Sequence, residues 1–108
     1  MFWVDIRHTV RYALNMKIFG WNYEKNRKLK RERGVSFEEV VFCIEQGQVL
    51  DVLEHPNQNR YKGQRIYVVG INDYAYIVPF VDVGEERFLI TIFPSRKYTK
   101  IYFDKEVD

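Results

Sequence analysis

Three side chains in this sequence could act together on a phosphate group. His55 can donate or accept a proton near neutral pH, which makes it the candidate general acid or base. Arg65 and Arg96 carry guanidinium groups, which bind a phosphate through two parallel hydrogen bonds. If the strand that begins at Arg65 and the strand that ends before Arg96 meet at one edge, both arginines could hold the same phosphate. The alternatives are an exposed His55 without a role, and ordinary surface ion pairs for each arginine.

A cluster of cations near the N-terminus is the second functional signal. Residues 17–34 contain seven Lys or Arg against two Glu, a local charge of +5, whereas residues 35–108 contain eight against twelve, a local charge of −4. Clustered Lys and Arg most often contact phosphates, so this segment, with Lys28 and Arg31, predicts a surface for RNA or for an acidic partner. The alternative is a solvated face that keeps the protein in solution.

Other kinds of chemistry find little support in the sequence. His8 and His55 are the only histidines and Cys43 is the only cysteine, and none has further ligands at metal-binding spacing. There is no glycine-rich phosphate loop, so we expect neither a metal nor a cofactor. Cys43 stands among apolar residues and is expected to be a buried structural thiol. With no signal-peptide pattern and no apolar run that could span a membrane, we expect a cytoplasmic protein without a membrane partner.

Two helices are predicted ahead of the sheet. Asn22 is typical of an N-cap and Gly34 of a C-terminal cap, which places a polar, basic helix over residues 23–33. Ser36 and Glu39 form a capping-box pattern at the start of the next helix. This second helix ends near Gly47, and its apolar residues recur at helical spacing: Phe37, Val40, Val41 and Ile44.

Four strands and a short helix follow. Asn72-Asp73 predicts a two-residue hairpin between the second and third strands. Pro79 has no amide donor, which predicts an edge or a bulge in that part of the third strand. Ser95 then opens a helix over about residues 95–103. The predicted strands cover residues 49–54, 65–71, 74–81 and 87–93.

These elements predict an α+β fold in a single domain of residues 1–108. The four strands form an antiparallel meander, the two helices before it pack on one face, and a short helix ends the chain. Residues 1–15 are predicted to be an N-terminal extension of a core at residues 16–103, because Met16 stands just before the first strand-like stretch. Four apolar residues of the extension share a helical face and predict a helix over residues 3–14: Trp3, Ile6, Val10 and Leu14.

Three motifs, taken in order, resemble those of the BrnT toxins. Residues 21–25 begin with Trp-Asn and end with Lys, similar to the family's Trp-Asp-x-x-Lys start. Residues 34–39 read Gly-Val-Ser-Phe-Glu-Glu, which matches the entry to a helix in that family. Residues 94–97 read Pro-Ser-Arg-Lys and are similar to its Ile-Ser-Ala-Arg-Lys segment. The resemblance runs from about residue 19 to residue 102.

This resemblance implies a RelE-like fold and the toxin component of a type II toxin–antitoxin system. Such a toxin cleaves RNA without a metal, by attack of a ribose 2′-hydroxyl on the adjacent phosphate, so the protein positions RNA, stabilises charge and moves protons. The resemblance also implies a BrnA-like ribbon-helix-helix antitoxin, and either a homodimer or a toxin–antitoxin heterotetramer. With the residues above, the candidate catalytic set is Arg65, Arg96, Lys25 and His55, and the candidate RNA-binding set is Trp21, Lys28, Arg31 and Lys97.

The chain departs from the family pattern at three places. Glu32-Arg33 stands where a Lys-His pair is common, and Thr91 stands where the last strand often has an arginine. The final helix also lacks the typical acidic residue between Lys100 and Tyr102. A second hypothesis is therefore a non-catalytic module that binds RNA or a protein through the basic helix over residues 23–33. A short neighbouring gene with a ribbon-helix-helix pattern would favour the toxin.

Overall fold

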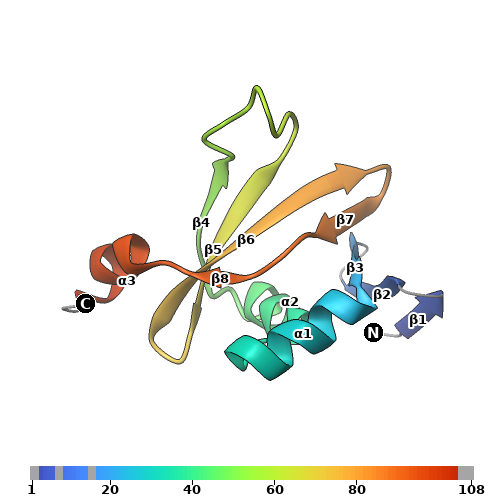
Figure 1. Cartoon of the computed structure of the whole chain (residues 1–108), viewed down its shortest axis with the longest axis horizontal. Helices are drawn as coiled ribbons and strands as arrows, with labels where there is room; N and C mark the ends of the chain where they lie inside the picture. The colour runs from blue at the N-terminus through green and yellow to red at the C-terminus, as the bar shows by residue number, and fades with distance from the viewer. Residues whose placement is uncertain (1–2, 7–8, 15–16, 105–108) are drawn as a thin grey trace.

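The computed structural model describes residues 3–6, 9–14 and 17–104, which form one mixed sheet and three helices (Figure 1). The order of paired strands is β1-β2-β3-β7-β6-β5-β4, and the short β8 pairs with β6. No helix in these ranges is long and apolar enough to cross a membrane. The elements are β1 (Trp3–Ile6), β2 (Thr9–Leu14), β3 (Lys17–Asn22), α1 (Tyr23–Arg33), α2 (Phe37–Glu45), β4 (Val49–Glu54), β5 (Arg65–Ile71), β6 (Tyr74–Val83), β7 (Glu86–Leu89), β8 (Phe93–Pro94) and α3 (Arg96–Phe103).

The strands β4 to β7 form the predicted antiparallel meander, which confirms the α+β class. Each strand pairs with the next, from Glu54 opposite Arg65 to Val83 opposite Glu86. Between β5 and β6, Asn72 and Asp73 have φ angles of 53° and 60°. Positive φ at both positions is the geometry of the predicted two-residue hairpin.

Of the two alternatives predicted for Pro79, the edge is wrong and the bulge is present on the neighbouring side: Ile77 pairs with Phe93 and Phe80 with Leu89, so three steps along β6 face four along β7 and β8. β6 is an inner strand, paired with β5 on one side and with β7 and β8 on the other. The missing amide is tolerated because the neighbouring strand is the irregular one: β7 ends at Leu89, β8 begins at Phe93, and Ile90 N–H donates to Pro79 O at 2.8 Å. The strand predicted over residues 87–93 is therefore two pieces.

The N-terminal residues add strands to the sheet, so the helix predicted over residues 3–14 is wrong. β1 pairs with β2 and β2 with β3, all antiparallel. The apolar Val10, Tyr12 and Leu14 also recur at every second position, which is strand spacing. β3 joins this part to the meander through a parallel pairing with β7, in which Ile18 lies opposite Glu86.

A chain that begins at Met16 tests whether residues 1–15 are an extension. The described core clusters draw on residues from Phe19 to Phe103, so we expect this shorter chain to fold and to melt within about 8 °C of the full chain. Thermal unfolding of both chains measures the difference. A larger drop in melting temperature, equivalent to a loss of more than about 1–2 kcal/mol in the free energy of unfolding, would mean that β1 and β2 stabilise the domain by covering β3.

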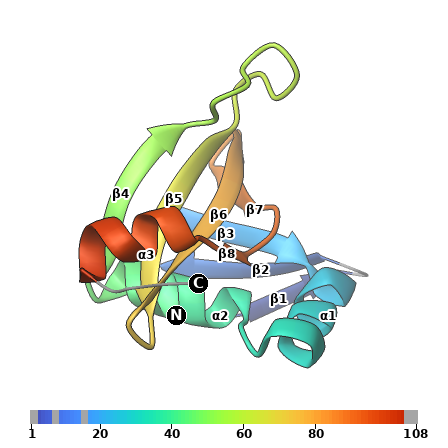
Figure 2. The ribbon, with the colours of Figure 1, turned by 60° about the vertical axis from the view of Figure 1, so that its left-hand side comes forward.

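The two faces of the sheet are covered by different helices. Alternate residues of β5 face opposite ways: Tyr67 and Val69 belong to the core under α1 and α2, whereas Ile66 and Val68 belong to a cluster that Tyr98 and Phe103 of α3 complete. We call these the α1/α2 face and the α3 face; Figure 2 shows α3 crossing the sheet well away from α1. The largest fully buried side chains include Trp21, Phe37, Phe80, Leu89 and Ile92.

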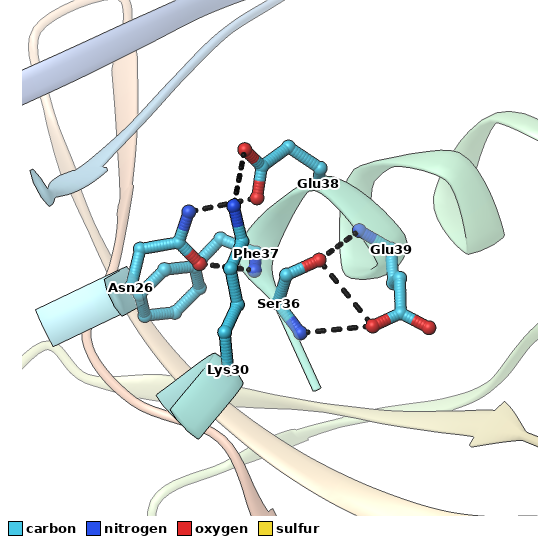
Figure 3. A network of polar contacts seen from close by, with 6 residues as sticks. All are labelled: Asn26, Lys30, Ser36, Phe37, Glu38 and Glu39. Atoms are coloured by element: carbon cyan, nitrogen blue, oxygen red, sulfur yellow. Dashed lines mark hydrogen bonds and ion pairs between the residues drawn. The ribbon is translucent and has the colours of Figure 1, made fainter. Parts of the chain in front are cut away.

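Both predicted helix starts are confirmed. Asn22 Oδ1 accepts a hydrogen bond from Lys25 N–H at 2.9 Å, and Gly34 ends α1 with a φ of 68°. Ser36 Oγ accepts from Glu39 N–H at 3.2 Å, while Glu39 Oε1 accepts from Ser36 N–H at 3.0 Å (Figure 3). The capping signals therefore fix where α1 ends and α2 begins.

A buried amide joins α1 to α2. Asn26 is 4% exposed; its Oδ1 accepts from Phe37 N–H at 2.8 Å and its Nδ2 donates to Glu38 at 2.7 Å (Figure 3). Lys30 Nζ lies 3.4 Å from the other carboxylate oxygen of Glu38. Burial acts to raise the pKa of Glu38, but its hydrogen bonds from Asn26 and its own backbone, with the nearby charge of Lys30, lower the pKa overall. No pattern in the sequence predicts this contact.

Candidate functional site

A cavity of about 400 Å³ opens on the α3 face and contains two of the predicted site residues, His55 and Lys97. His55 follows β4 and Lys97 lies in the first turn of α3, so only the folded chain brings them together. Binding sites for small molecules commonly have volumes of about 300–1,000 Å³. The cavity is lined by His55, Pro56, Ile66, Ile77, Pro79, Phe93, Lys97 and Tyr98.

The loop between β4 and β5 holds the ring of His55 in place. Asn57 N–H donates to His55 Nδ1 at 3.1 Å, and the ring packs on Tyr61 with centroids 4.3 Å apart. Gln58 Nε2 donates to the carbonyl oxygens of His55 and Gln64, at 2.9 and 3.0 Å, and so ties the two ends of the loop. Because Nδ1 accepts a hydrogen bond, the neutral ring has its proton on Nε2, which is the nitrogen left to donate to a ligand.

The first turn of α3 is anchored to β6, and this anchor places Lys97. Ser95 caps the helix, with its Oγ accepting from Tyr98 N–H at 3.1 Å. Ser95 N–H donates to Ala75 O at 2.9 Å, and the buried Thr99 Oγ1 accepts from Ala75 N–H at 2.9 Å. Lys97 Nζ lies 5.4 Å from the centroid of the Tyr98 ring, a cation–π contact at the cavity.

The two segments that flank the cavity are basic. Residues 55–64 contain Arg60 and Lys62, residues 95–103 contain Arg96, Lys97 and Lys100, and neither segment has an Asp or Glu. None of these five cations forms an ion pair with another residue of the described ranges. Of the five, Lys97 lines the cavity, and its charge favours an anionic ligand there.

Arg65 and Arg96 do not share a phosphate site, so that prediction is wrong. The second and fourth strands of the meander do not meet, because β6 lies between β5 and β7. The guanidinium of Arg65 lies 5.4 Å from the Phe80 ring, on the α1/α2 face. Arg96 begins α3, which packs on the opposite face, and its side chain is exposed.

Arg87 is a well-placed arginine that the sequence reasoning missed. Its Nε and Nη2 bind Asp82 at 2.7 and 2.9 Å, its Nη1 donates to Tyr67 Oη at 2.6 Å, and its guanidinium lies 4.5 Å from the Phe80 ring. The hydrogen bond to Asp82 raises the pKa of Arg87, so its charge is permanent. Asp82 and Arg87 are opposite each other across the hairpin, and the turn at residues 84–85 was the signal that could have revealed this pair.

Trp21 is a core residue, so its assignment to RNA binding is wrong. Its side chain is 0% exposed, and its ring stacks on Phe37 with centroids 5.7 Å apart. The predicted buried thiol is confirmed: Cys43 is 5% exposed, its Sγ lies 3.5 Å from Gly70 O, and burial raises its pKa.

Some cations of the basic helix α1 bind other groups of the protein, and we call the others the available cations. Arg33 Nη1 donates to Ile92 O at 2.6 Å, Lys30 pairs with Glu38, and Arg27 lies 4.0 Å from Glu24. The other cations of α1 have no ion pair within the described part of the chain. α1 packs on the face opposite to the cavity, so the structure does not place the predicted catalytic lysine of this helix beside His55. The available cations are Lys25, Lys28 and Arg31.

The available cations of α1 predict how binding of single-stranded RNA depends on salt. Each phosphate that a cation neutralises adds about −0.7 to the slope of log K against log salt concentration. We therefore expect Lys28→Gln with Arg31→Gln to flatten the slope by about one unit or more. The control exchanges the two residues, Lys28→Arg with Arg31→Lys, and should keep the slope. An unchanged slope in the first variant would mean that α1 is a solvated face or serves another partner.

Comparisons with protein-family models, with curated proteins and with solved structures find no match for this chain. The site is therefore interpreted from its own geometry. It combines an imidazole of fixed orientation, an ammonium group and aromatic walls in one cavity. Such a set of groups can bind an anion, donate hydrogen bonds to it and stabilise additional negative charge.

Proposed function

We propose that this protein is a metal-independent endoribonuclease, the toxin of a type II toxin–antitoxin system, acting in the cytoplasm. The observation that supports this most is the meeting of His55 and Lys97 in one cavity. The two were candidates on separate grounds, His55 for its proton chemistry and Lys97 through the resemblance to the BrnT toxins. The meander, the two helices on one face and the C-terminal helix agree with the RelE-like fold that this resemblance implies.

The proposed reaction is a transesterification of RNA at the His55–Lys97 cavity. The ribose 2′-oxygen forms a bond to phosphorus and the bond from phosphorus to the 5′-oxygen breaks, which leaves a 2′,3′-cyclic phosphate and a 5′-hydroxyl. The 2′-hydroxyl proton leaves to water, and the departing 5′-oxygen takes a proton from the Lys97 ammonium. His55 Nε2–H donates to a non-bridging phosphate oxygen, and this hydrogen bond strengthens as negative charge builds up on the phosphorane.

The available cations of α1 are proposed to serve binding. Lys25, Lys28 and Arg31 of α1 would contact RNA beyond the cavity or a BrnA-like ribbon-helix-helix antitoxin. Assembly as a homodimer or as a toxin–antitoxin heterotetramer belongs to the same proposal. Arg87 lies in β7, four positions before Thr91, and its bonds to Asp82 and Tyr67 hold it on the α1/α2 face, away from the cavity.

Induction of the chain in bacteria tests the proposed function in cells. We expect growth to stop, and to resume when a neighbouring ribbon-helix-helix gene is expressed as well. His55→Ala with Lys97→Ala should abolish the arrest, whereas Phe42→Ala, a change of an exposed side chain on α2, should retain it. An arrest that persists without His55 and Lys97 would contradict the cavity as its cause.

The second candidate function is a non-catalytic module that binds RNA or a protein through α1. The observation that favours it is the position of the available α1 cations on the face opposite to the cavity. Such a module would bind RNA with the salt dependence predicted above but would leave the RNA intact.

A further inference from the structure

We propose that the His55–Lys97 cavity accepts one unstacked nucleobase of the RNA, with the adjoining phosphate at its rim. This inference rests on the proposed function and adds the form of the substrate: a single strand whose bases can leave the stack. A base inside a duplex is paired and stacked, and it has to be taken out of the helix before a protein pocket can enclose it.

The walls of the cavity suit a flat ring. Ile66 and Ile77, 7% and 6% exposed, come from the sheet beneath it, and Pro79 continues the same surface. Two aromatic residues, Phe93, 38% exposed, and Tyr98, whose ring also stacks on Tyr102 with centroids 6.2 Å apart, complete the lining. Nucleobases stack on aromatic faces whatever their identity, because every base has a π-face.

The polar groups of the cavity suit a phosphate attached to that ring. Lys97 Nζ lies 5.4 Å from the centroid of Tyr98, so a positive charge stands beside an aromatic wall. The Nε2–H of His55 is a second donor, because Asn57 N–H already occupies Nδ1. Apolar ring surface next to a cation and a donor is the complement of a nucleotide, whereas a bare anion would leave the apolar walls of the cavity unused.

Binding of nucleoside monophosphates to the whole protein tests this inference without any cleavage step. Titrations followed by NMR compare the four nucleoside 5′-monophosphates with ribose 5-phosphate and inorganic phosphate. We expect the nucleotides to bind on the order of tenfold more tightly than ribose 5-phosphate, because only they can stack. Equal affinities would overturn the nucleobase pocket and leave an anion site, and failure of every nucleotide to bind would overturn it too.

Variants of the lining residues test whether the preference for nucleotides over ribose 5-phosphate arises in this cavity. Phe93→Ala should remove most of the difference between nucleotide and ribose 5-phosphate, and Phe93→Leu, which retains volume without a flat ring, should remove part of it. Lys97→Gln should weaken all three kinds of ligand. Phe42→Ala removes an exposed phenyl ring, 58% exposed, on α2 and should change nothing. Selectivity that survives Phe93→Ala in a variant with an unchanged melting temperature would contradict the proposed pocket.

Nucleotide binding and RNA cleavage, measured on the same protein, test the nucleobase pocket and the ribonuclease separately. A protein that cleaves RNA but binds nucleotides no better than ribose 5-phosphate refutes the nucleobase pocket alone. A protein that binds nucleotides in this cavity but leaves RNA intact refutes the ribonuclease alone.

Discussion

Lys97→Ala is expected to slow RNA cleavage by about a hundredfold, equivalent to about 3 kcal/mol of transition-state stabilisation. The ammonium lines the cavity, where the phosphorane carries more negative charge than the bound substrate. RNA affinity should therefore fall much less than the cleavage rate. Single-turnover cleavage of a labelled RNA, measured beside binding, separates the two effects.

Neighbouring cations provide the controls for Lys97. Arg96 stands next to it in α3 but does not line the cavity, so Arg96→Ala should cost less than Lys97→Ala. Lys62→Ala removes an exposed charge from the loop after His55 and should have the smallest effect. If Lys62→Ala slowed cleavage as much as Lys97→Ala, the general positive field, and not a placed group, would explain the activity.

Trp21→Ala is expected to destabilise the fold by about 3–5 kcal/mol, the usual cost of removing a large buried aromatic side chain. Trp21 is fully buried and stacks on Phe37, so the change leaves a cavity between β3 and α2. Urea unfolding measures the difference. Tyr23→Ala, two residues away and 39% exposed, is the control and should cost less than about 1 kcal/mol. Unchanged stability with weakened RNA binding would return Trp21 to the RNA-binding set.

The helices and most strands could be predicted because their signals are local. Asn22, Gly34 and Ser36 act on backbone groups within a few residues, so a cap in the sequence is a cap in the structure. The N-terminal strands were missed because Val10 and Leu14 fit helical spacing as well as strand spacing. The parallel pairing of β3 with β7 joins residues far apart in the chain, and no local pattern announces it.

The sequence predicts which residue types belong to the candidate site better than it predicts how they are arranged. His55 and Lys97 were both candidates, but their meeting depends on the α3 face, which no short motif specifies. The first of the motifs that resemble the BrnT toxins has a structural role in this chain: Trp21 fills the core and Asn22 caps α1. A motif of this kind indicates the fold more directly than the function. Arg65 and Arg96 lie on opposite faces of the sheet. The sequence could not predict this, because it does not say which face of the sheet each residue would occupy.

The most direct test of the central claim is single-turnover cleavage of single-stranded RNA in EDTA, by the wild-type chain and by His55→Ala. We expect the wild-type chain to produce fragments that end in a 2′,3′-cyclic phosphate and a 5′-hydroxyl. We also expect His55→Ala to lower the cleavage rate by about a hundredfold while RNA still binds, as for other lost donors to a transition-state charge. A wild-type chain that binds RNA and leaves it intact, or a His55→Ala variant that cleaves at the wild-type rate, would contradict the account.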